Sequence, residues 1–172
     1  NNVPIFTQSG NFGTRLVPEA AAPRYIFASL NPDFHKYFCD EEVCDQNKDD
    51  EHPEPQTYLP LIPWVLVNGI EGIAVGFACK YAPHNPKLLA KACIEYLSGK
   101  KINPNNLVPQ WPGFKGQVTP DATGDLSKSV MVGNVERIKR NTWLISEVPF
   151  GTSRESYYNH LVKMEEDGKI ED

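Results

Sequence analysis

The sequence lacks any apolar run long enough to cross a membrane as a helix. Such a helix needs about 20 apolar residues in succession, and no segment of the 172 residues approaches that length. The first ten residues, NNVPIFTQSG, have neither a basic region nor an apolar stretch, so they do not resemble a secretory signal. We therefore predict a cytoplasmic protein with no membrane partner. Because residue 1 is Asn and not Met, we interpret the chain as a piece of a longer protein.

Cysteine and histidine are scarce, with four residues of each. The spacing of Cys39 and Cys44 is not that of a usual zinc knuckle, and no Cys/His pair follows at zinc-site spacing. The histidines are scattered along the chain. The sequence therefore predicts reduced thiols, as in cytosolic proteins, and no metal site of its own.

An excess of positive charge, typical of nucleic-acid-binding proteins, is also missing, because the net charge is −5. Two segments account for this acidity. Residues 40–54 have a net charge of −7 and residues 165–172 one of −4, which leaves +6 for the rest of the chain. Only the field at a binding surface governs contact with phosphates, so this composition does not exclude DNA as a ligand.

Fifteen prolines predict many turns and short elements. Proline fits the first turn of a helix better than its interior, so a helix start near Pro23 would place Arg24 and Tyr25 at the end of an element. The acidic run 40–56 predicts an exposed loop and a module boundary. Hydrophobic spacing and cap signals predict helices within 31–39, 86–101 and 153–170, a strand ending at Asn68-Gly69, and further strands within 71–85 and 128–151.

The pair Arg24-Tyr25 is the first candidate for chemistry. A tyrosine hydroxyl is a weak nucleophile at neutral pH because it holds its proton. A neighbouring guanidinium can stabilise the charge that gathers on a phosphate under attack, and its planar fork fits two phosphate oxygens at once. Taken alone, the dipeptide favours an ordinary half-buried tyrosine with a solvated arginine beside it.

Four blocks around and after this pair occur in a fixed order. They are QSGNFGTR and AAAPRYI at residues 8–15 and 20–26, PLIP at 60–63 followed by VNG at 67–69, EGIAVG at 71–76 with PHN at 83–85, and ISEVPF at 145–150. Together they cover nearly the whole chain. The chain resembles the breakage-and-reunion subunit of type IIA DNA topoisomerases, of the gyrase and topoisomerase IV kind. The LSGKK at 97–101 and the short acidic insert are similar to the medium subunit of the split topoisomerases of T-even-like bacteriophages.

The resemblance implies an α+β fold. Residues 1–56 would form the C-terminal part of a winged-helix domain that carries the active-site tyrosine. Residues 57–172 would form most of a tower domain with a mixed sheet and flanking helices. The implied activity is cleavage and religation of double-stranded DNA through a 5′-phosphotyrosyl intermediate, with ATP-dependent passage of a second duplex in the full complex.

The resemblance also implies catalytic roles and partners. Tyr25 would be the nucleophile, and Arg24 would stabilise the transition state. Mg²⁺ would be held by a partner Toprim domain, because this chain contains no Asp-x-Asp motif, and ATP would be bound by a partner ATPase domain. The protein would be a homodimer, located in the bacterial host cytoplasm if it is phage-encoded. The family's basic DNA-contacting helices lie upstream of the glycine turn, so the isolated fragment should bind DNA poorly and cleave nothing.

Three residues are predicted to contact DNA by the same resemblance. Ile73 would wedge between base pairs and help to bend the duplex, which is physically reasonable because an apolar side chain can replace lost stacking; composition alone favours a place in the sheet core. Arg15 and Lys80 would contact phosphates, with solvated surface charges as the alternative. The basic cluster Arg137, Lys139 and Arg140 indicates a turn surface, with DNA backbone contact as a second interpretation.

Two other functions stay open from the sequence. A non-catalytic DNA-bending module could keep the fold and use Tyr25 only for packing. A nucleotide-binding enzyme could use the glycines at 69, 72 and 76, although this stretch lacks the Lys-Ser/Thr of a P-loop and the glycine spacing of a dinucleotide-binding turn.

Overall fold

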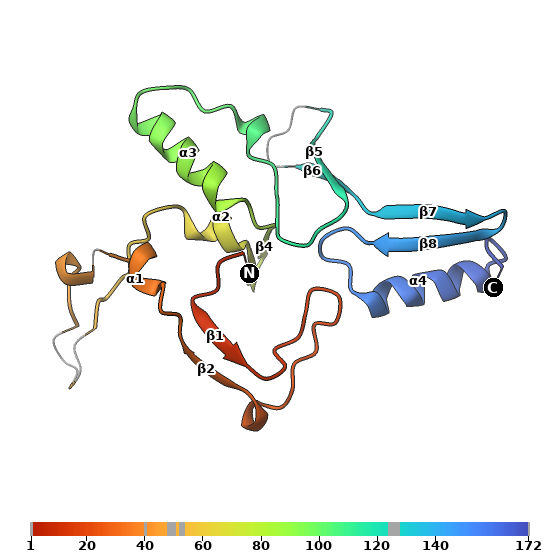
Figure 1. The fold of residues 1–172 in the computed structure, drawn as a ribbon, viewed down its shortest axis with the longest axis horizontal. Coiled ribbons are helices and arrows are strands. Elements are labelled where there is room, and N and C mark those ends of the chain that lie inside the picture. Colours follow the sequence, from red (N-terminus) through yellow and green to blue (C-terminus); the bar gives the residue numbers. More distant parts are fainter. Residues whose placement is uncertain (1, 40, 48–50, 52–53, 124–127, 172) are drawn as a thin grey trace. The chain divides into compact units, whose positions relative to one another are not determined.

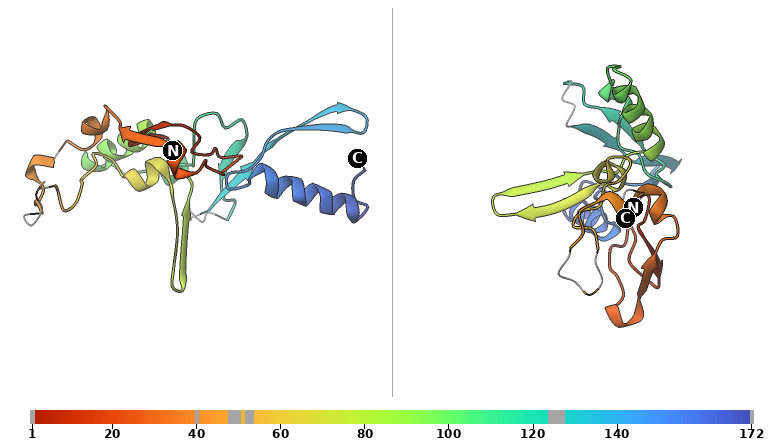
Figure 2. Two further views of the ribbon diagram at one scale, coloured as in Figure 1. Left: turned by 90° about the horizontal axis from the view of Figure 1, so that it is seen from below. Right: turned by 90° about the vertical axis from the view of Figure 1, so that its left-hand side faces the viewer.

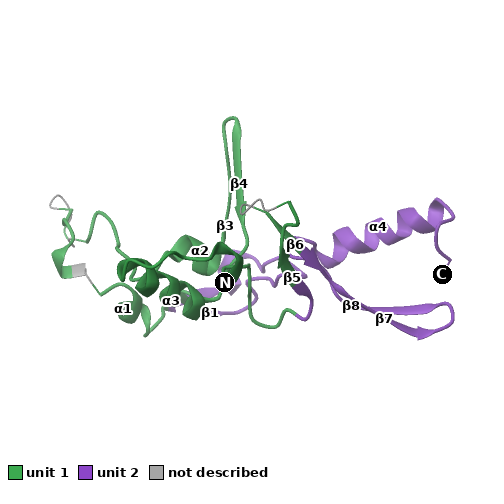
Figure 3. Ribbon diagram, turned by 90° about the horizontal axis from the view of Figure 1, so that it is seen from above, with its two compact units in different colours: residues 1–7, 30–114, 118–130 green, residues 8–29, 115–117, 131–172 purple. Residues whose placement is uncertain are grey.

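The structure is a computed structural model, and it describes residues 2–39, 41–47, 51, 54–123 and 128–171. Its elements (Figure 1) fall into two compact units (Figure 3): unit 1 with residues 1–7, 30–114 and 118–130, and unit 2 with residues 8–29, 115–117 and 131–172. The helices are α1 (Phe34–Tyr37), α2 (Trp64–Asn68), α3 (Pro86–Leu97) and α4 (Arg154–Glu166), with 3-10 turns η1 (Pro23–Tyr25), η2 (Glu41–Val43) and η3 (Pro104–Asn106).

The strands of the described residues form four two-stranded sheets. They pair as β1 (Phe6–Ser9) with β2 (Phe27–Leu30), β3 (Ile70–Ala74) with β4 (Phe77–Tyr81), β5 (Gln117–Pro120) with β6 (Ser129–Val132), and β7 (Asn134–Lys139) with β8 (Thr142–Glu147).

The core of unit 1 lies where α2 packs on α3. Val67 of α2 is 0 % exposed and Leu89 of α3 is 2 % exposed. The start of α3 is set by its local sequence, because the Asn85 side chain accepts a hydrogen bond from the Lys87 amide at 2.9 Å and Pro86 occupies the first turn. The two most buried side chains of this unit therefore lie on helices.

An aromatic cluster extends this core towards α1. The rings of Phe34 and Phe38 are stacked with centroids 4.7 Å apart, and Phe38 lies 5.1 Å from Trp64 of α2. Tyr58 meets Phe34 edge to face at 5.8 Å. The proline-rich segment before α2 thus folds back on α1, and the Leu61 amide donates to the Tyr37 carbonyl oxygen at 3.0 Å.

The β3–β4 hairpin projects from unit 1 as a two-stranded arm (Figure 2). The strands are antiparallel, with Ile73 opposite Ala78 and Ala74 opposite Phe77, so a two-residue turn joins them. Gly76 in this turn has a φ of +77°, a conformation that favours glycine. Gly69 before β3 has a φ of +71°, and a Cβ there would lie 2.5 Å from the Tyr81 carbonyl oxygen. The VNG and GIAVG blocks therefore encode a turn into the arm and a turn at its tip.

Unit 2 contains the antiparallel hairpin β7–β8 and helix α4. The Arg137 guanidinium lies over the Trp143 ring, 5.6 Å from its centroid, and its Nε donates to the carbonyl oxygens of Lys139 and Arg140, each at 3.1 Å, so this basic cluster braces the hairpin turn. Helix α4 begins after Ser153, whose hydroxyl accepts from the Ser156 amide at 3.1 Å. This cap is the one that the sequence indicates.

The predicted α+β class is confirmed, with helices at 86–97 and 154–166 inside the predicted ranges. The strand predicted to end at Asn68-Gly69 is wrong, because Trp64–Asn68 is helical. A mixed sheet was predicted for residues 57–172, whereas the described residues there form separate two-stranded sheets, antiparallel in β3–β4 and β7–β8. The division at residue 56 and the winged-helix and tower assignments stay predictions. The acidic insert lies partly outside the described residues.

Within the part of the chain that the structure describes, every helix is too short or too polar to cross a membrane.

Candidate functional site

The residues before Tyr25 form a loop shaped by two glycines. Gly10 has a φ of +102°, and a Cβ on it would lie 2.9 Å from the Tyr25 carbonyl oxygen and 2.9 Å from Ile26 Cγ2. Gly13 has a φ of +81°, and a Cβ there would lie 2.5 Å from the Pro18 carbonyl oxygen. Both positions need glycine, for space as well as for backbone conformation. The first glycine lets the start of the loop pack directly against the tyrosine's own backbone.

Hydrogen bonds close this loop on itself. The Ala21 amide donates to the Asn11 carbonyl oxygen at 2.9 Å, and the Asn11 side-chain oxygen accepts from the Gly13 amide at 2.9 Å. The Thr14 amide donates to the Val17 carbonyl oxygen at 2.7 Å. Residues 10–22 therefore form an ordered support that leads into the tyrosine.

Arg24 and Tyr25 lie on η1, where Pro23 occupies the first position. The Tyr25 side chain is 68 % exposed, so its hydroxyl is accessible to a ligand. The Arg24 guanidinium carbon lies 6.0 Å from the Tyr25 ring centroid, at the outer limit of a cation–π contact. An accessible hydroxyl beside a guanidinium can bind and attack a phosphate, and the predicted element end near Pro23 is confirmed.

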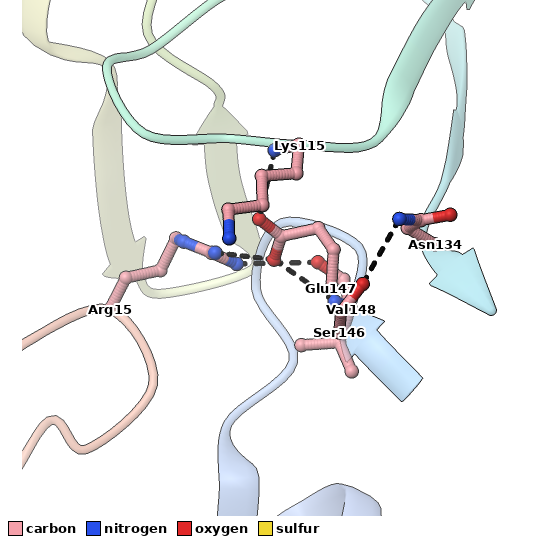
Figure 4. Close-up of polar contacts among 6 residues, drawn as sticks. All are labelled: Arg15, Lys115, Asn134, Ser146, Glu147 and Val148. Carbon is pink, nitrogen blue, oxygen red and sulfur yellow. Dashed lines mark hydrogen bonds and ion pairs between the residues drawn. The ribbon is translucent and has the colours of Figure 1, made fainter. Parts of the chain in front are cut away.

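A buried carboxylate holds the middle of the loop (Figure 4). Glu147 is 7 % exposed and lies at the end of β8. Arg15 Nη2 contacts Glu147 Oε1 at 2.5 Å, and Arg15 Nη1 donates to the Val148 carbonyl oxygen at 3.3 Å. The Lys115 amide donates to Oε2 and the Val148 amide to Oε1, each at 3.0 Å. Glu147 thus joins three stretches of unit 2.

These contacts set the ionisation of Glu147. Burial by itself raises the pKa of its carboxyl. The hydrogen bonds from Arg15 and from the Lys115 and Val148 amides, together with the Arg15 charge, lower the pKa by a larger amount, so it lies below its ordinary value of 4.5. Glu147 is consequently a carboxylate at neutral pH. Its stabilising contribution is present above the unfolded-state pKa and is lost as the pH falls through the lower folded-state pKa.

We predict that Glu147→Gln destabilises the protein by about 1–3 kcal/mol at neutral pH, because it removes a charged partner of Arg15. The difference from wild type should shrink below about pH 4.5, where the carboxyl of the unfolded wild-type protein takes up a proton while the folded-state carboxyl, with its lower pKa, is still ionised. Thermal unfolding of both full-length proteins between pH 7 and pH 3.5 measures this. A difference that stays constant over the whole range would contradict the prediction.

Ile73 lies near the tip of the β3–β4 arm and is 90 % exposed. The sheet-core position that composition favours is therefore wrong in this structure. Val75 in the turn is 99 % exposed and Phe77 is 82 % exposed, so the tip is apolar as a whole. An exposed apolar tip on a projecting arm is suited to insertion into a partner.

Arg15 and Lys80 both have carboxylate partners. Lys80 Nζ lies 3.2 Å from Glu71 Oε1, directly across the β3–β4 arm, with both side chains exposed. Such a surface pair contributes about 0–1 kcal/mol and exchanges readily for another anion. Arg15 is engaged by the buried Glu147 instead. Phosphate contact stays a prediction for both residues. It would cost more free energy for Arg15 than for Lys80, because Arg15 would have to leave a buried carboxylate.

Known proteins match the whole of this chain. The family formed by the A subunits of DNA gyrase and topoisomerase IV matches residues 1–172. The chain belongs to this family. The DNA topoisomerase medium subunit of Enterobacteria phage T4 is 36 % identical over 162 residues, covering 94 % of this chain and 35 % of the phage protein. DNA topoisomerase 2 of Bombyx mori is 35 % identical over 169 residues, covering 95 % of this chain and 10 % of its own length.

A solved structure matches the fold of this chain. The DNA-binding, cleavage and re-ligation domain of Plasmodium falciparum topoisomerase II aligns with a TM-score of 0.84 and 27 % sequence identity, over 98 % of this chain and 23 % of that one. The predicted family is therefore confirmed. The chain spans about a third of the phage relative and about a tenth of the insect one.

The described residues of the chain contain no group of three or more His, Cys, Asp or Glu side chains that could hold a metal ion. They do not fit a magnesium site, so no step below is routed through a metal on this chain. Glu147 was not singled out in the sequence, although its block ISEVPF was. The signal in the sequence is that Glu147 is a charged residue within an apolar stretch. A charge buried there requires a partner, and only the structure identifies that partner.

Proposed function

We propose that this chain supplies the nucleophile for DNA cleavage and religation by a type IIA topoisomerase. Tyr25 Oη loses its proton and attacks a backbone phosphorus, so that an Oη–P bond forms and the P–O3′ bond breaks. The phosphate stays on the 5′ end as a phosphotyrosyl ester, and the 3′ oxygen takes up a proton. Reversal of these steps reseals the strand without ATP, because the ester retains the phosphodiester linkage.

The observation that carries this proposal is the placement of Tyr25. Its side chain is 68 % exposed beside Arg24, at the end of a loop whose two glycines cannot carry a Cβ without a clash. The rival function, a non-catalytic DNA-bending module, would use Tyr25 for packing, and the exposure of the residue gives that role little support.

Arg24 would act on the phosphate during this step. Its guanidinium can donate two parallel hydrogen bonds to phosphate oxygens, and charge-assisted bonds of this kind strengthen as negative charge builds up. The rest of the site would come from other parts of the assembly. Mg²⁺ would be held by a Toprim partner, ATP by an ATPase partner, and a second copy of this chain would cut the opposite strand of the duplex.

Trapping of the covalent adduct tests this function. The full-length protein would be incubated with its Toprim and ATPase partner, Mg²⁺ and 3′-labelled duplex DNA. The reaction would be stopped with denaturant during turnover, and the protein would be digested. Mass spectrometry should locate the nucleotide on the peptide that contains Tyr25. An adduct on any other residue, or none at all, would refute the proposal.

The β3–β4 arm would bend the DNA that is cut. An apolar side chain between base pairs replaces lost stacking at a kink, and the 90 % exposure of Ile73 supports this role. Lys80 would release Glu71 and bind a nearby phosphate. Arg15 stays a predicted phosphate contact, and a phosphate there would have to compete with Glu147 for its guanidinium.

We predict that Ile73→Ala reduces DNA bending by the assembled enzyme and lowers the rate of cleavage, since the kink loses the group that fills it. Folding should be nearly unchanged, because a substitution at an exposed position shifts stability by about 0.5 kcal/mol or less. Energy transfer between dyes at the two ends of a short duplex measures the bend. Ile94→Ala, at an exposed site on α3, is the control, and equal bending by wild type and Ile73→Ala would remove the wedge role.

A further inference from the structure

The buried ion pair in unit 2 lies on the loop that carries the proposed nucleophile. We propose that Glu147 and Arg15 position Tyr25 for attack, so that Glu147 acts on the reaction through Arg15 and the loop without touching DNA. This inference rests on the proposed function of Tyr25. It assigns Arg15 a role different from the phosphate contact that its sequence block predicts.

The first support is the completeness of the carboxylate's contacts. Both oxygens of Glu147 are used: Oε1 by Arg15 and the Val148 amide, and Oε2 by the Lys115 amide (Figure 4). The Glu147 side chain is 4 % exposed and that of Arg15 is 24 % exposed. A buried carboxylate is tolerated only when it is paired and hydrogen-bonded, so the position of Arg15 is tightly specified by β8.

The second support is a second clamp beside the first. The Leu16 carbonyl oxygen accepts a hydrogen bond from the Arg154 amide at 2.9 Å, at the first residue of α4. Consecutive loop residues are therefore bound to two different elements of the unit, Arg15 to the end of β8 and Leu16 to the start of α4. The middle of the loop cannot shift without breaking both attachments.

The third support is the connection from this clamp to the tyrosine. Two backbone hydrogen bonds close the loop around Arg15. The Thr14 amide donates to the Val17 carbonyl oxygen at 2.7 Å, and the Ala21 amide donates to the Asn11 carbonyl oxygen at 2.9 Å. At the start of the loop, Gly10 lies against the Tyr25 carbonyl oxygen with no room for a Cβ. A displacement at Arg15 therefore passes through a closed loop to the backbone of Tyr25.

The effect on rate follows from the geometry of in-line attack. Reacting atoms must be held about 3–3.5 Å apart, and a misplacement of about 1 Å costs about 10²-fold in rate. Tyr25 is 68 % exposed among the described residues, so its position depends mainly on the backbone that carries it. Loss of the clamp should thus slow cleavage more than it weakens DNA binding.

The test uses Glu147→Gln in the full-length protein, assembled with its Toprim and ATPase partner. Glutamine keeps the shape and one acceptor oxygen but loses the charge that holds Arg15. We expect single-turnover cleavage to fall about 10- to 100-fold, with the dissociation constant for DNA unchanged within about twofold. Arg15→Lys, which keeps a cation without the two-point fork, should be intermediate between wild type and Arg15→Ala.

The control separates positioning from loss of stability. Leu89→Ala truncates the unit 1 core, where Leu89 is 2 % exposed, and should lower the unfolding temperature at least as much as Glu147→Gln. Assayed well below both unfolding temperatures, it should cleave at the wild-type rate. If it slows cleavage as much as Glu147→Gln does, general destabilisation explains the effect and the positioning role is wrong.

Two other outcomes would overturn the proposal. Cleavage by Glu147→Gln at the wild-type rate would show that the pair does not position the tyrosine. If Arg15→Ala weakens DNA binding and reduces its salt dependence by about one phosphate contact while the cleavage rate of bound DNA is unchanged, Arg15 is a phosphate contact instead. Neither outcome depends on the proposed function itself, which fails only if the wild-type adduct is absent or lies on a residue other than Tyr25.

Discussion

Replacing Tyr25 with Phe should abolish the covalent protein–DNA adduct. The change removes a single oxygen, and without it no phosphotyrosyl ester can form. We expect a fall of about 10³-fold or more in adduct and in strand passage, because loss of a nucleophile is not compensated by its neighbours. The measurement is adduct trapped on labelled DNA by the full-length enzyme with Mg²⁺.

Binding and folding should survive this change. The Tyr25 side chain is 68 % exposed, so removing its hydroxyl leaves no buried group unsatisfied. The dissociation constant for DNA and the unfolding temperature should match wild type. Tyr158→Phe is a matched control, because Tyr158 is 65 % exposed on α4 and should give a wild-type amount of adduct. Equal adduct from wild type and Tyr25→Phe would instead favour the DNA-bending module.

Replacing Arg24 with Ala should slow cleavage by about 10²- to 10³-fold, the usual cost of losing one donor to a developing negative charge. Arg24 is exposed and lies beside the nucleophile, with its guanidinium carbon 6.0 Å from the Tyr25 ring centroid. Lysine at this position should recover part of the rate, because it supplies the charge without the two-point geometry. Single-turnover cleavage with saturating DNA separates this effect from binding.

A charge control completes that experiment. Lys91→Ala removes one exposed positive charge from α3, where Lys91 Nζ lies 3.9 Å from Glu95 Oε1. It should change neither the cleavage rate nor the salt dependence of binding. If Arg24→Ala alters only the affinity for DNA and leaves the rate with bound DNA intact, the transition-state role is wrong and Arg24 is a simple phosphate contact.

Local signals in the sequence were sufficient for several elements. Asn85 before α3 and Ser153 before α4 specify helix starts through contacts two or three residues away, and Pro86 occupies the first turn of α3. The glycines of the Tyr25 loop and of the β3–β4 turn occupy positions with positive φ. Each of these is decided by backbone geometry over a few residues, so a single sequence is enough to predict it.

The segment Trp64–Asn68 shows where local signals fail. Its apolar, β-branched composition indicates a strand, but it forms a helix whose Val67 is 0 % exposed against α3. Five residues make too short a helix for its period to be recognised in the sequence. The same applies to Ile73, which composition places in a core and the arm exposes, because burial depends on what packs alongside.

The sequence by itself determined the family, the position of the proposed nucleophile and its arginine, and the glycine turns around them, because these depend on residue types at short and fixed spacings. Only the tertiary structure decided that Arg15 is held by a carboxylate 132 residues away and that Ile73 stands at the exposed tip of an arm. The physical reason is that a contact between distant residues depends on how the chain closes long loops, and no local pattern records that closure. Tyr25 is recognisable from its neighbours in sequence, whereas the clamp that supports it becomes visible only when β8 and the glycine loop are seen together.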